Sequence, residues 1–222
     1  MNKTHIYILI AVMAVLLGGA MSSCSETQAD DGEFDNWKSR NEQYFSRVYS
    51  EAKAKADAGD ASWKVLRSTT LNDDVAKHDY DHVVVQVLNQ GTGSGCPFYT
   101  DSVKVHYSGR LMPSANYPQG MVFDQSWTGD YNLATMQPRN FAVSGVVSGF
   151  ATAMQNMHIG DRWVVTIPYQ LGYGSATNAG QAYSTLVFDI TLVGYFRVEA
   201  PAQAMAKDGR VAAPARGHWV YE

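Results

Sequence analysis

The sequence has few cysteines and few charged residues, and these shortages exclude several classes of protein. Only two of the 222 residues are cysteines, Cys24 and Cys96, so the chain is not a disulfide-rich scaffold and must depend on a hydrophobic core. Charged residues make up 17% of the chain and the formal net charge is −4. A basic excess of the kind that binds nucleic acid is therefore missing, and we expect no nucleic-acid partner.

Motifs for nucleotides, metals and covalent catalysis are also missing. The Gly-rich stretch 90–95 has neither the GxGxxG spacing nor the Lys-Ser/Thr pair of a phosphate-binding loop. His78, Asp79, Asp81 and His82 have a loosely metal-like spacing, but a solvated loop is the simpler interpretation. No Ser/His/Asp set stands out in a usable order. We therefore expect no metal ion and no cofactor.

A long apolar run occurs only at the N-terminus. Lys3 precedes an apolar stretch, 6–21, whose 16 residues fall short of the roughly 20 that a membrane-spanning helix needs. This pattern predicts a secretory signal peptide. Small residues directly precede Cys24, which resembles the signal of a bacterial lipoprotein. In that pattern the leader 1–23 is removed and Cys24 becomes the site of lipid attachment.

Two alternatives to the lipid anchor remain open. The protein could be secreted in soluble form, with Cys24 in the discarded leader or its flank, or Cys24 could form a disulfide with Cys96. Acidic residues crowd the segment 24–35, which we interpret as a solvated tether. The interpretation that we favour places the protein in the cell envelope, anchored by lipid to the outer membrane on its periplasmic or surface face.

A helix is predicted over 34–58. Asp35 is a candidate cap for its start, and Gly59 stands just past its end. Its apolar residues recur at intervals of three, four or seven positions, which places them on one face: Trp37, Tyr44, Phe45, Val48 and Ala52. This face either packs on the helix's own domain or forms the arm of a homodimer.

Strand patterns dominate the rest of the chain. In the segment 101–111, Val103, Val105 and Tyr107 alternate with Lys104, His106 and Ser108, so the two sets face opposite ways. His106 is expected to face solvent or a neighbouring strand. The other predicted strands are 63–67, 82–88, 121–126, 141–143, 161–167 and 186–193.

One short helix interrupts these strands. Phe150, Met154 and Met157 have helical spacing, with Ser148 as a candidate cap and Gly160 as the stop. Several strands around one short helix predict an α+β fold in which an antiparallel sheet wraps over the helix. From Ala200 onward the composition predicts a mobile tail.

Taken in order over about 83–193, these blocks resemble the FKBP-type peptidyl-prolyl cis-trans isomerases. The resemblance implies a five- or six-stranded antiparallel half-barrel around a short helix, with a shallow aromatic pocket for a prolyl side chain. It also divides the chain into a segment 36–81, an isomerase domain 82–198 and a flexible tail 199–222. The matching blocks are Val103–Leu111, Phe123–Ser126, Val146–Phe150, Met157–Gly160, Ile167–Gly174 and Ser184–Ile190.

The resemblance also assigns the pocket residues. It implies catalytic roles for Tyr107, Asp124 and Tyr173, and substrate-binding roles for Phe123, Val146, Val147, Phe150 and Phe188. The expected activity is the isomerisation of proline-containing polypeptides, which would assist the folding of exported proteins. A non-catalytic chaperone or peptide-binding module with the same fold is the alternative.

Three departures from the family pattern bear on affinity. Phe150 stands where many members have Trp, which removes an indole N–H. Arg139 falls where the family often has a further pocket aromatic, and Gly180-Gln181 replaces an Ile-Pro pair that normally covers the pocket. The loops 112–120 and 126–139 are also longer than the family minimum.

Overall fold

The computed structural model describes residues 32–198 and 217–222, so the leader, Cys24 and most of the tether lie outside the described residues. The helices are α2 (Trp37–Asp57) and α3 (Ser148–Met154), with short 3-10 turns η1 (Asp79–Asp81), η2 (Val143–Gly145) and η3 (Tyr169–Leu171). The strands are β1 (Trp63–Arg67), β2 (His82–Asn89), β3 (Ser102–Leu111), β4 (Val122–Gln125), β5 (Arg139–Ala142), β6 (Arg162–Ile167), β7 (Leu186–Val198) and β8 (Gly217–Val220).

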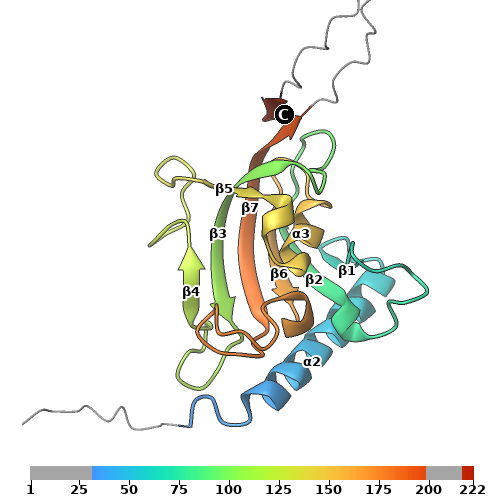
Figure 1. Ribbon diagram of the computed structural model, residues 1–222, viewed down its shortest axis with the longest axis vertical. Helices are drawn as coiled ribbons and strands as arrows, with labels where there is room; N and C mark the ends of the chain where they lie inside the picture. The colour runs from blue at the N-terminus through green and yellow to red at the C-terminus, as the bar shows by residue number, and fades with distance from the viewer. Residues whose placement is uncertain (1–31, 199–216) are drawn as a thin grey trace, which may run out of the picture. The chain divides into compact units, whose positions relative to one another are not determined.

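In the described residues all eight strands join one antiparallel sheet (Figure 1). The order along it is β1-β2-β6-β7-β3-β4, with β5 paired to β3 and β8 paired to β7. The predicted α+β class is confirmed, although the sheet has more strands than the five or six expected. The resemblance predicts a boundary between residues 36–81 and residues 82–198. Both parts contribute to this one sheet, because every residue of β1 pairs with β2.

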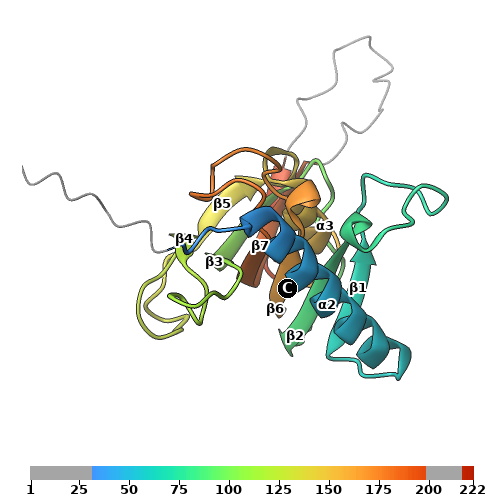
Figure 2. The ribbon, with the colours of Figure 1, turned by 90° about the horizontal axis from the view of Figure 1, so that it is seen from below.

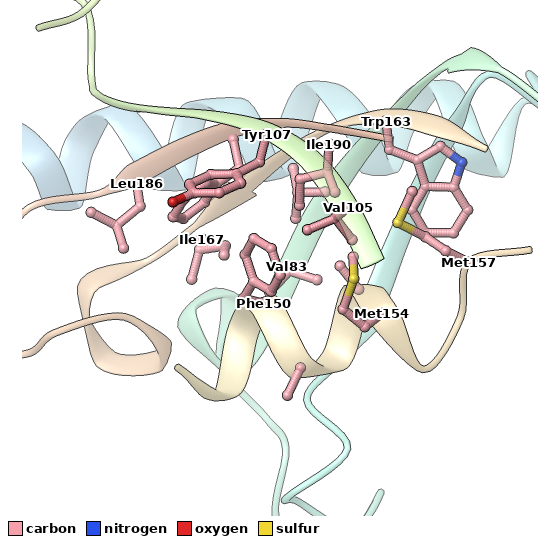
Figure 3. Packing of buried hydrophobic residues seen from close by; sticks show 14 of the residues in the cluster. Val83, Val105, Tyr107, Phe150, Met154, Met157, Trp163, Ile167, Leu186 and Ile190 are labelled. Carbon is pink, nitrogen blue, oxygen red and sulfur yellow. The ribbon is translucent and has the colours of Figure 1, made fainter. Parts of the chain in front are cut away.

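The short helix α3 packs on one face of the sheet, which we call the inner face. This face carries Tyr107, Trp163 and Ile190, which are buried in one cluster with Phe150 and Met154 of the helix, and Trp163 lies beside Met157 (Figure 3). The alternation predicted for β3 is thereby confirmed, and β6 likewise sends every second side chain into this core: Trp163, Val165 and Ile167. The core holds the strands that surround the pocket described below.

The longer helix α2 runs beside β1 and β2 (Figure 2), and its side chains Phe45 and Ala52 pack on the opposite, outer face. Strand β2 shows this directly: Val83 and Val85 join the inner core, whereas Val84 contacts Phe45 and Ala52 of α2. A strand covered on both faces needs consecutive apolar residues rather than alternation, which explains its run of valines. The apolar face of α2 therefore packs on its own domain, as one of the two interpretations expected.

Both predicted helix caps are wrong. The N-cap of α2 is Asn36, in a left-handed conformation and without a side-chain capping bond, so Asp35 does not cap the helix. The Ser148 hydroxyl donates to the Leu171 carbonyl instead of capping α3. That helix ends at Met154, well before Gly160. Packing on the sheet determines where the short helix begins and ends, and the capping residues in its sequence do not predict these ends.

The expectation that His106 faces solvent is also wrong. His106 pairs with Thr191 across the sheet, as the cross-strand alternative foresaw, but only 3% of its surface is exposed. The long loop after β4 contacts this part of the outer face: the Tyr131 hydroxyl lies 2.7 Å from the Thr191 hydroxyl, and the Arg162 guanidinium lies 3.5 Å from the Tyr131 ring centre. A loop insertion thus buries polar residues that the strand pattern assigns to solvent.

The segment 199–222 is not flexible throughout, contrary to expectation. Its last part forms β8, which pairs with the extended end of β7 through residues 195–198. Trp219 and Tyr221 stack at 5.9 Å between ring centres, and the Lys104 ammonium donates to the Tyr221 hydroxyl at 2.7 Å. A four-residue strand is too short to stand out from the Ala/Pro-rich sequence before it.

Candidate functional site

A cavity of about 210 Å³ opens on the inner face beside the start of α3. All eight residues that the resemblance assigns to catalysis or substrate binding line this one cavity, although they come from five separate stretches of the chain. The volume is below the roughly 300–1,000 Å³ of pockets for drug-sized ligands, so it suits a single side chain. The lining residues are Tyr107, Phe123, Asp124, Phe141, Gly145, Val146, Val147, Phe150, Tyr173 and Phe188.

Edge-to-face aromatic packing forms the apolar floor of the cavity. The Phe150 and Phe188 ring centres lie 5.1 Å apart at an interplanar angle of 83°, and those of Phe123 and Phe188 lie 5.5 Å apart at 84°. These are preferred geometries for aromatic pairs, in which ring edges meet ring faces. Each ring therefore restrains the next, and the floor presents a fixed shape.

A glycine in β3 makes this ring packing possible. A Cβ atom on Gly109 would lie 2.6 Å from the Phe188 ring and 2.7 Å from the Phe123 ring, closer than real Cβ contacts. The backbone of β3 thus forms the surface on which these two pocket rings rest. Gly109 is part of the matching Val103–Leu111 block, but sequence reasoning assigned it no role.

Tyr107 and Asp124 provide one polar edge of the cavity. The Tyr107 hydroxyl donates to Asp124 Oδ2 at 2.5 Å. Burial, and then the bond to Asp124, raise the pKa of Tyr107 well above its ordinary value of 10. The two strands are held in place beside this pair, because the Tyr107 backbone N–H donates to the Ser126 hydroxyl at 2.9 Å. This hydrogen bond fixes the position of the Asp124 carboxylate at the cavity.

Tyr173 provides a second hydroxyl at the cavity. Its ring meets that of Phe123 edge-to-face at 6.4 Å. Burial, and then the negative charge of Asp124, raise the pKa of Tyr173, so its phenol stays protonated at neutral pH and can donate a hydrogen bond. The turn that carries Tyr173 is closed by Gly174, whose N–H donates to the Tyr169 carbonyl at 2.8 Å.

Sequence reasoning missed Phe141. It treated Arg139 as a gap in the aromatic lining, but Arg139 is an exposed residue at the start of β5, whereas Phe141, two residues further on, lines the cavity. The Phe141 ring lies 5.4 Å from that of Tyr107 and 6.3 Å from that of Phe150. Because alternate residues of a strand share a face, a shift of two positions keeps an aromatic on the pocket side.

Gly180 and Gln181 are not among the residues that line the cavity. The Gln181 carbonyl accepts from the Ser184 hydroxyl at 2.8 Å, and the Ser184 oxygen in turn accepts from the Trp37 indole N–H at 2.8 Å. This loop is thus connected to α2. In this structure the loop therefore contributes no apolar contact to the cavity through Gly180 or Gln181.

Other candidate sites receive little support from the described part of the chain. No group of three or more His, Cys, Asp or Glu side chains there is arranged to hold a metal ion. The Asp81 carboxylate accepts the backbone N–H groups of Lys77 and His78, which closes a local turn. The Cys96 sulfur lies 3.8 Å from His158 Nδ1, and burial raises the pKa of this thiol. None of the helices described in residues 32–198 has the length and apolar character to cross a bilayer.

Comparison with known proteins finds a family whose model matches part of the chain. Residues 96–193 match the family model of the FKBP-type peptidyl-prolyl cis-trans isomerases. The chain is 40% identical over 111 residues to the FKBP-type 22 kDa peptidyl-prolyl cis-trans isomerase of Escherichia coli, covering 49% of this chain and 47% of that protein. It is 33% identical over 153 residues to FkpA of Escherichia coli, covering 67% of this chain and 52% of that protein.

Two further comparisons complete the picture. The chain is 33% identical over 110 residues to the outer membrane protein MIP of Legionella longbeachae, covering 49% of this chain and 42% of that protein. A solved peptidyl-prolyl cis-trans isomerase from Pseudomonas syringae pv. tomato gives a TM-score of 0.49 at 29% identity, covering 71% of this chain and 95% of that one. The chain spans about half the length of the curated relatives it matches.

Proposed function

We propose that this chain, whose residues 96–193 match the FKBP-type peptidyl-prolyl cis-trans isomerase family, catalyses the cis-trans isomerisation of peptide bonds that precede proline. Such bonds have two isomers within about 1 kcal/mol of each other, yet they interconvert over tens to hundreds of seconds. Unfolded polypeptides containing proline are the natural substrates. The role that follows is assistance to protein folding.

The chemistry requires no bond to be made or cleaved. Rotation must break amide resonance, which sets a barrier of roughly 18–20 kcal/mol. A catalyst needs only to bind the twisted amide better than the planar one, and each ~1.4 kcal/mol of preference gives about a tenfold rate increase. The twisted amide has less charge separation than the planar amide. An apolar pocket that excludes water therefore raises the free energy of the twisted form less than that of the planar form.

Each lining residue has a proposed part in this selection. The rings of Phe123, Phe150 and Phe188, with the side chains of Val146 and Val147, receive the prolyl ring. The Tyr173 hydroxyl donates to a substrate carbonyl. The Val147 backbone N–H, at the start of α3 where N–H groups have no partner within the helix, donates to a second carbonyl.

Asp124 is proposed to act on the carbonyl that rotates. Its carboxylate stands beside the path of that oxygen and disfavours the planar orientations through charge repulsion. Tyr107, by donating to Asp124, fixes the direction of the carboxylate. Asp124 would therefore touch the reacting group, whereas Tyr107 would mainly position Asp124.

One observation carries the proposal: aromatic rings, two hydroxyls and a carboxylate meet in a cavity sized for one side chain. A protease-coupled assay on short X–Pro peptides tests it. We expect catalysis well above the uncatalysed rate, reduced by Tyr173→Ala and by Asp124→Ala. A rate at background for the unaltered chain, with both variants equally inactive, would eliminate the enzyme.

The second candidate is a non-catalytic peptide-binding module or chaperone. One observation favours it: Gly180 and Gln181 are not among the residues that line the pocket. Titration of a proline peptide against pocket tryptophan is not possible, because Phe150 replaces that residue, so calorimetry is the suitable measurement. Binding without catalysis would support this alternative.

We propose that the protein acts in the bacterial cell envelope, attached to the membrane by lipid at Cys24. The leader 1–23 and the small residues before Cys24 support this, and one relative is named an outer membrane protein. Mass spectrometry of the mature N-terminus tests it. A diacylglycerol-modified Cys24 is expected, and an unmodified terminus at another residue would remove the membrane anchor.

We further propose that α2 serves its own domain and does not act as a dimerisation arm. The side chains Trp37, Phe45 and Ala52 are buried against the chain's own sheet, which leaves little apolar surface on α2 for a second copy. Sedimentation equilibrium is expected to give a monomer. A dimer that dissociates on substitution of exposed α2 residues would support the opposite interpretation.

A further inference from the structure

A second and larger cavity, which we call the α2 groove, lies between α2, η1 and η3. Its volume is about 620 Å³, compared with about 210 Å³ for the cavity beside the start of α3, which we call the prolyl pocket. The two cavities have no lining residue in common. The groove exists because α2 packs beside the turns that flank the sheet. It is lined by Asn41, Glu42, Gln43, Phe45, Ser46, Asp79, Tyr80, Pro168, Tyr169, Gln170 and Thr185.

The floor of the α2 groove is buried and is held by hydrogen bonds between Asn41 and Thr185. The Thr185 backbone N–H donates to Asn41 Oδ1 at 2.6 Å, and Asn41 Nδ2 donates to the Trp37 carbonyl at 2.8 Å. Asn41, Phe45 and Thr185 are all buried. These bonds join α2 to the residue directly before β7.

Two tyrosines form its walls. The Tyr169 hydroxyl donates to Glu42 Oε1 at 2.9 Å. Burial, and then this bond, raise the pKa of Tyr169 to about 12, with a smaller contribution from the nearby Tyr80. Tyr80, on the η1 side, is 36% exposed. The groove thus presents two aromatic rings, whose faces attract cations. The Tyr80 ring stacks on that of His78 at 4.6 Å between ring centres, which covers one of its two faces.

Its two charged lining residues, Glu42 and Asp79, are both acidic. Glu42 has a cation nearby, since the Lys38 ammonium lies 3.9 Å from its carboxylate and 6.0 Å from the Tyr169 ring centre. Asp79 has no ion-pair partner in the part of the chain that the structure describes, and its Oδ1 accepts only the Tyr80 backbone N–H, at 2.8 Å. The groove therefore has a negative charge left for a ligand to satisfy.

We propose that the α2 groove binds a lysine or arginine side chain of an extended, unfolded polypeptide, as a second anchor for clients of the isomerase. A carboxylate beside aromatic faces is the chemistry that recognises such a side chain. The short segment Pro168–Tyr173 joins the two sites, because Pro168 and Tyr169 line the groove and Tyr173 lines the prolyl pocket. The inference deepens the proposed function, since the partner is the isomerase's own substrate class.

The test uses a probe that the prolyl pocket does not recognise. A fluorescently labelled, proline-free peptide rich in lysine is titrated with the full chain and followed by anisotropy, next to the same peptide with glutamate in place of lysine. We expect the lysine peptide to bind and the glutamate peptide to bind at least about tenfold more weakly, the effect of one lost charge-assisted contact. Equal affinities for the two peptides would overturn the proposal.

Variants locate the binding to the groove. Asp79→Asn keeps the acceptor for the Tyr80 N–H while removing the charge, and is expected to weaken lysine-peptide binding about tenfold. Asp74→Asn removes the same charge from an exposed residue of the 71–78 loop and should change nothing. Tyr80→Ala gives a second, uncharged test of the groove. If Asp79→Asn and Tyr80→Ala both bind like the unaltered chain, the groove is not the site.

The same variants separate this inference from the proposed function. Isomerisation of a short X–Pro peptide without basic residues should be unchanged in Asp79→Asn. If lysine-peptide binding depends on Asp79 and the chain has no isomerase activity, the proposed groove is supported and only the proposed enzyme activity is refuted. If the chain has isomerase activity but binds the two peptides equally, the enzyme is supported and the proposed groove is refuted.

Discussion

At the scale of single residues, the site depends on a few contacts that fix otherwise mobile groups. Asp124 is exposed in β4 and would turn freely if the Tyr107 hydroxyl did not hold it. A carboxylate that must stand beside a rotating carbonyl gains from such a restraint, because catalysis depends on orientation prepared before the substrate arrives.

Removing that restraint gives a direct prediction. Tyr107→Phe keeps the buried ring and loses the hydrogen bond to Asp124, so we expect kcat/KM to fall about three- to tenfold with little change in stability of the fold. Tyr99→Phe, which removes a hydroxyl from an exposed residue, is the matched control. Equal activity of the two variants would show that Asp124 needs no positioning.

The phenol groups also predict the pH dependence. The pKa values of Tyr107 and Tyr173 are both raised above 10, so both hydroxyls remain protonated donors throughout the neutral range. Activity should therefore be flat between about pH 6 and pH 9. The pH profile of kcat/KM measures this, and a decline with a midpoint near pH 8 would contradict the donor role of Tyr173.

Gly109 tests the support beneath the rings. In Gly109→Ala the new methyl group would overlap the Phe123 and Phe188 rings, so we expect a loss of about 1–3 kcal/mol in unfolding free energy and a clear fall in kcat/KM. Ser108→Ala, at the adjacent outward-facing position, is the control, because the Ser108 hydroxyl is buried without a hydrogen-bond partner and its loss should be nearly neutral. Guanidinium titration and the peptide assay measure both effects, and equal behaviour of the two variants would count against the role of Gly109.

At the scale of elements, α2 is joined to the sheet through polar contacts as well as apolar ones. Asn41→Ala leaves the buried Thr185 N–H without its acceptor, which should cost about 1–3 kcal/mol of unfolding free energy. Gln43→Ala alters an exposed residue of the same helix and should cost less than about 0.5 kcal/mol. Chemical denaturation compares them, and similar stabilities would mean that α2 is only loosely docked.

At the scale of the whole molecule, long-range contacts decide what the local sequence cannot. The strand pattern was enough to predict an antiparallel sheet over a short helix, and the family resemblance, which rests on the order of the motifs, assigned eight residues to one pocket. The pocket role of Phe141 and the burial of His106 were not predictable, because the first depends on strand register and the second on where a long loop folds back. The ends of α3 and the strand β8 are likewise determined by packing partners distant in sequence.

The burial of His106 has a consequence for global stability. Desolvation lowers the pKa of His106 below its ordinary value of 6.5, so the unfolded chain binds more protons than the folded one just below that pH. Stability should therefore be full above about pH 7 and should fall as pH decreases from about 6.5 toward the lowered folded pKa. The charged side chains on the same face of the sheet are Lys104, Arg162 and Asp189, and the last two are paired at 2.7 Å.

Urea titrations at a series of pH values measure this dependence. His106→Gln should lose part of the decline between about pH 6.5 and pH 5, whereas His218→Gln, an exposed histidine of β8, should retain it. A decline of the same size in both variants would show that other groups produce it.

The central claim is that one ring-lined pocket speeds the rotation of a prolyl bond. Exchange NMR on a short Ala–Pro peptide measures the cis-trans interconversion rate at equilibrium, without a coupling protease. With substoichiometric protein we predict exchange cross-peaks between the cis and trans signals, which disappear in Phe123→Ala and weaken strongly in Tyr173→Phe. Separate cis and trans signals without exchange in the presence of the unaltered chain would contradict the account.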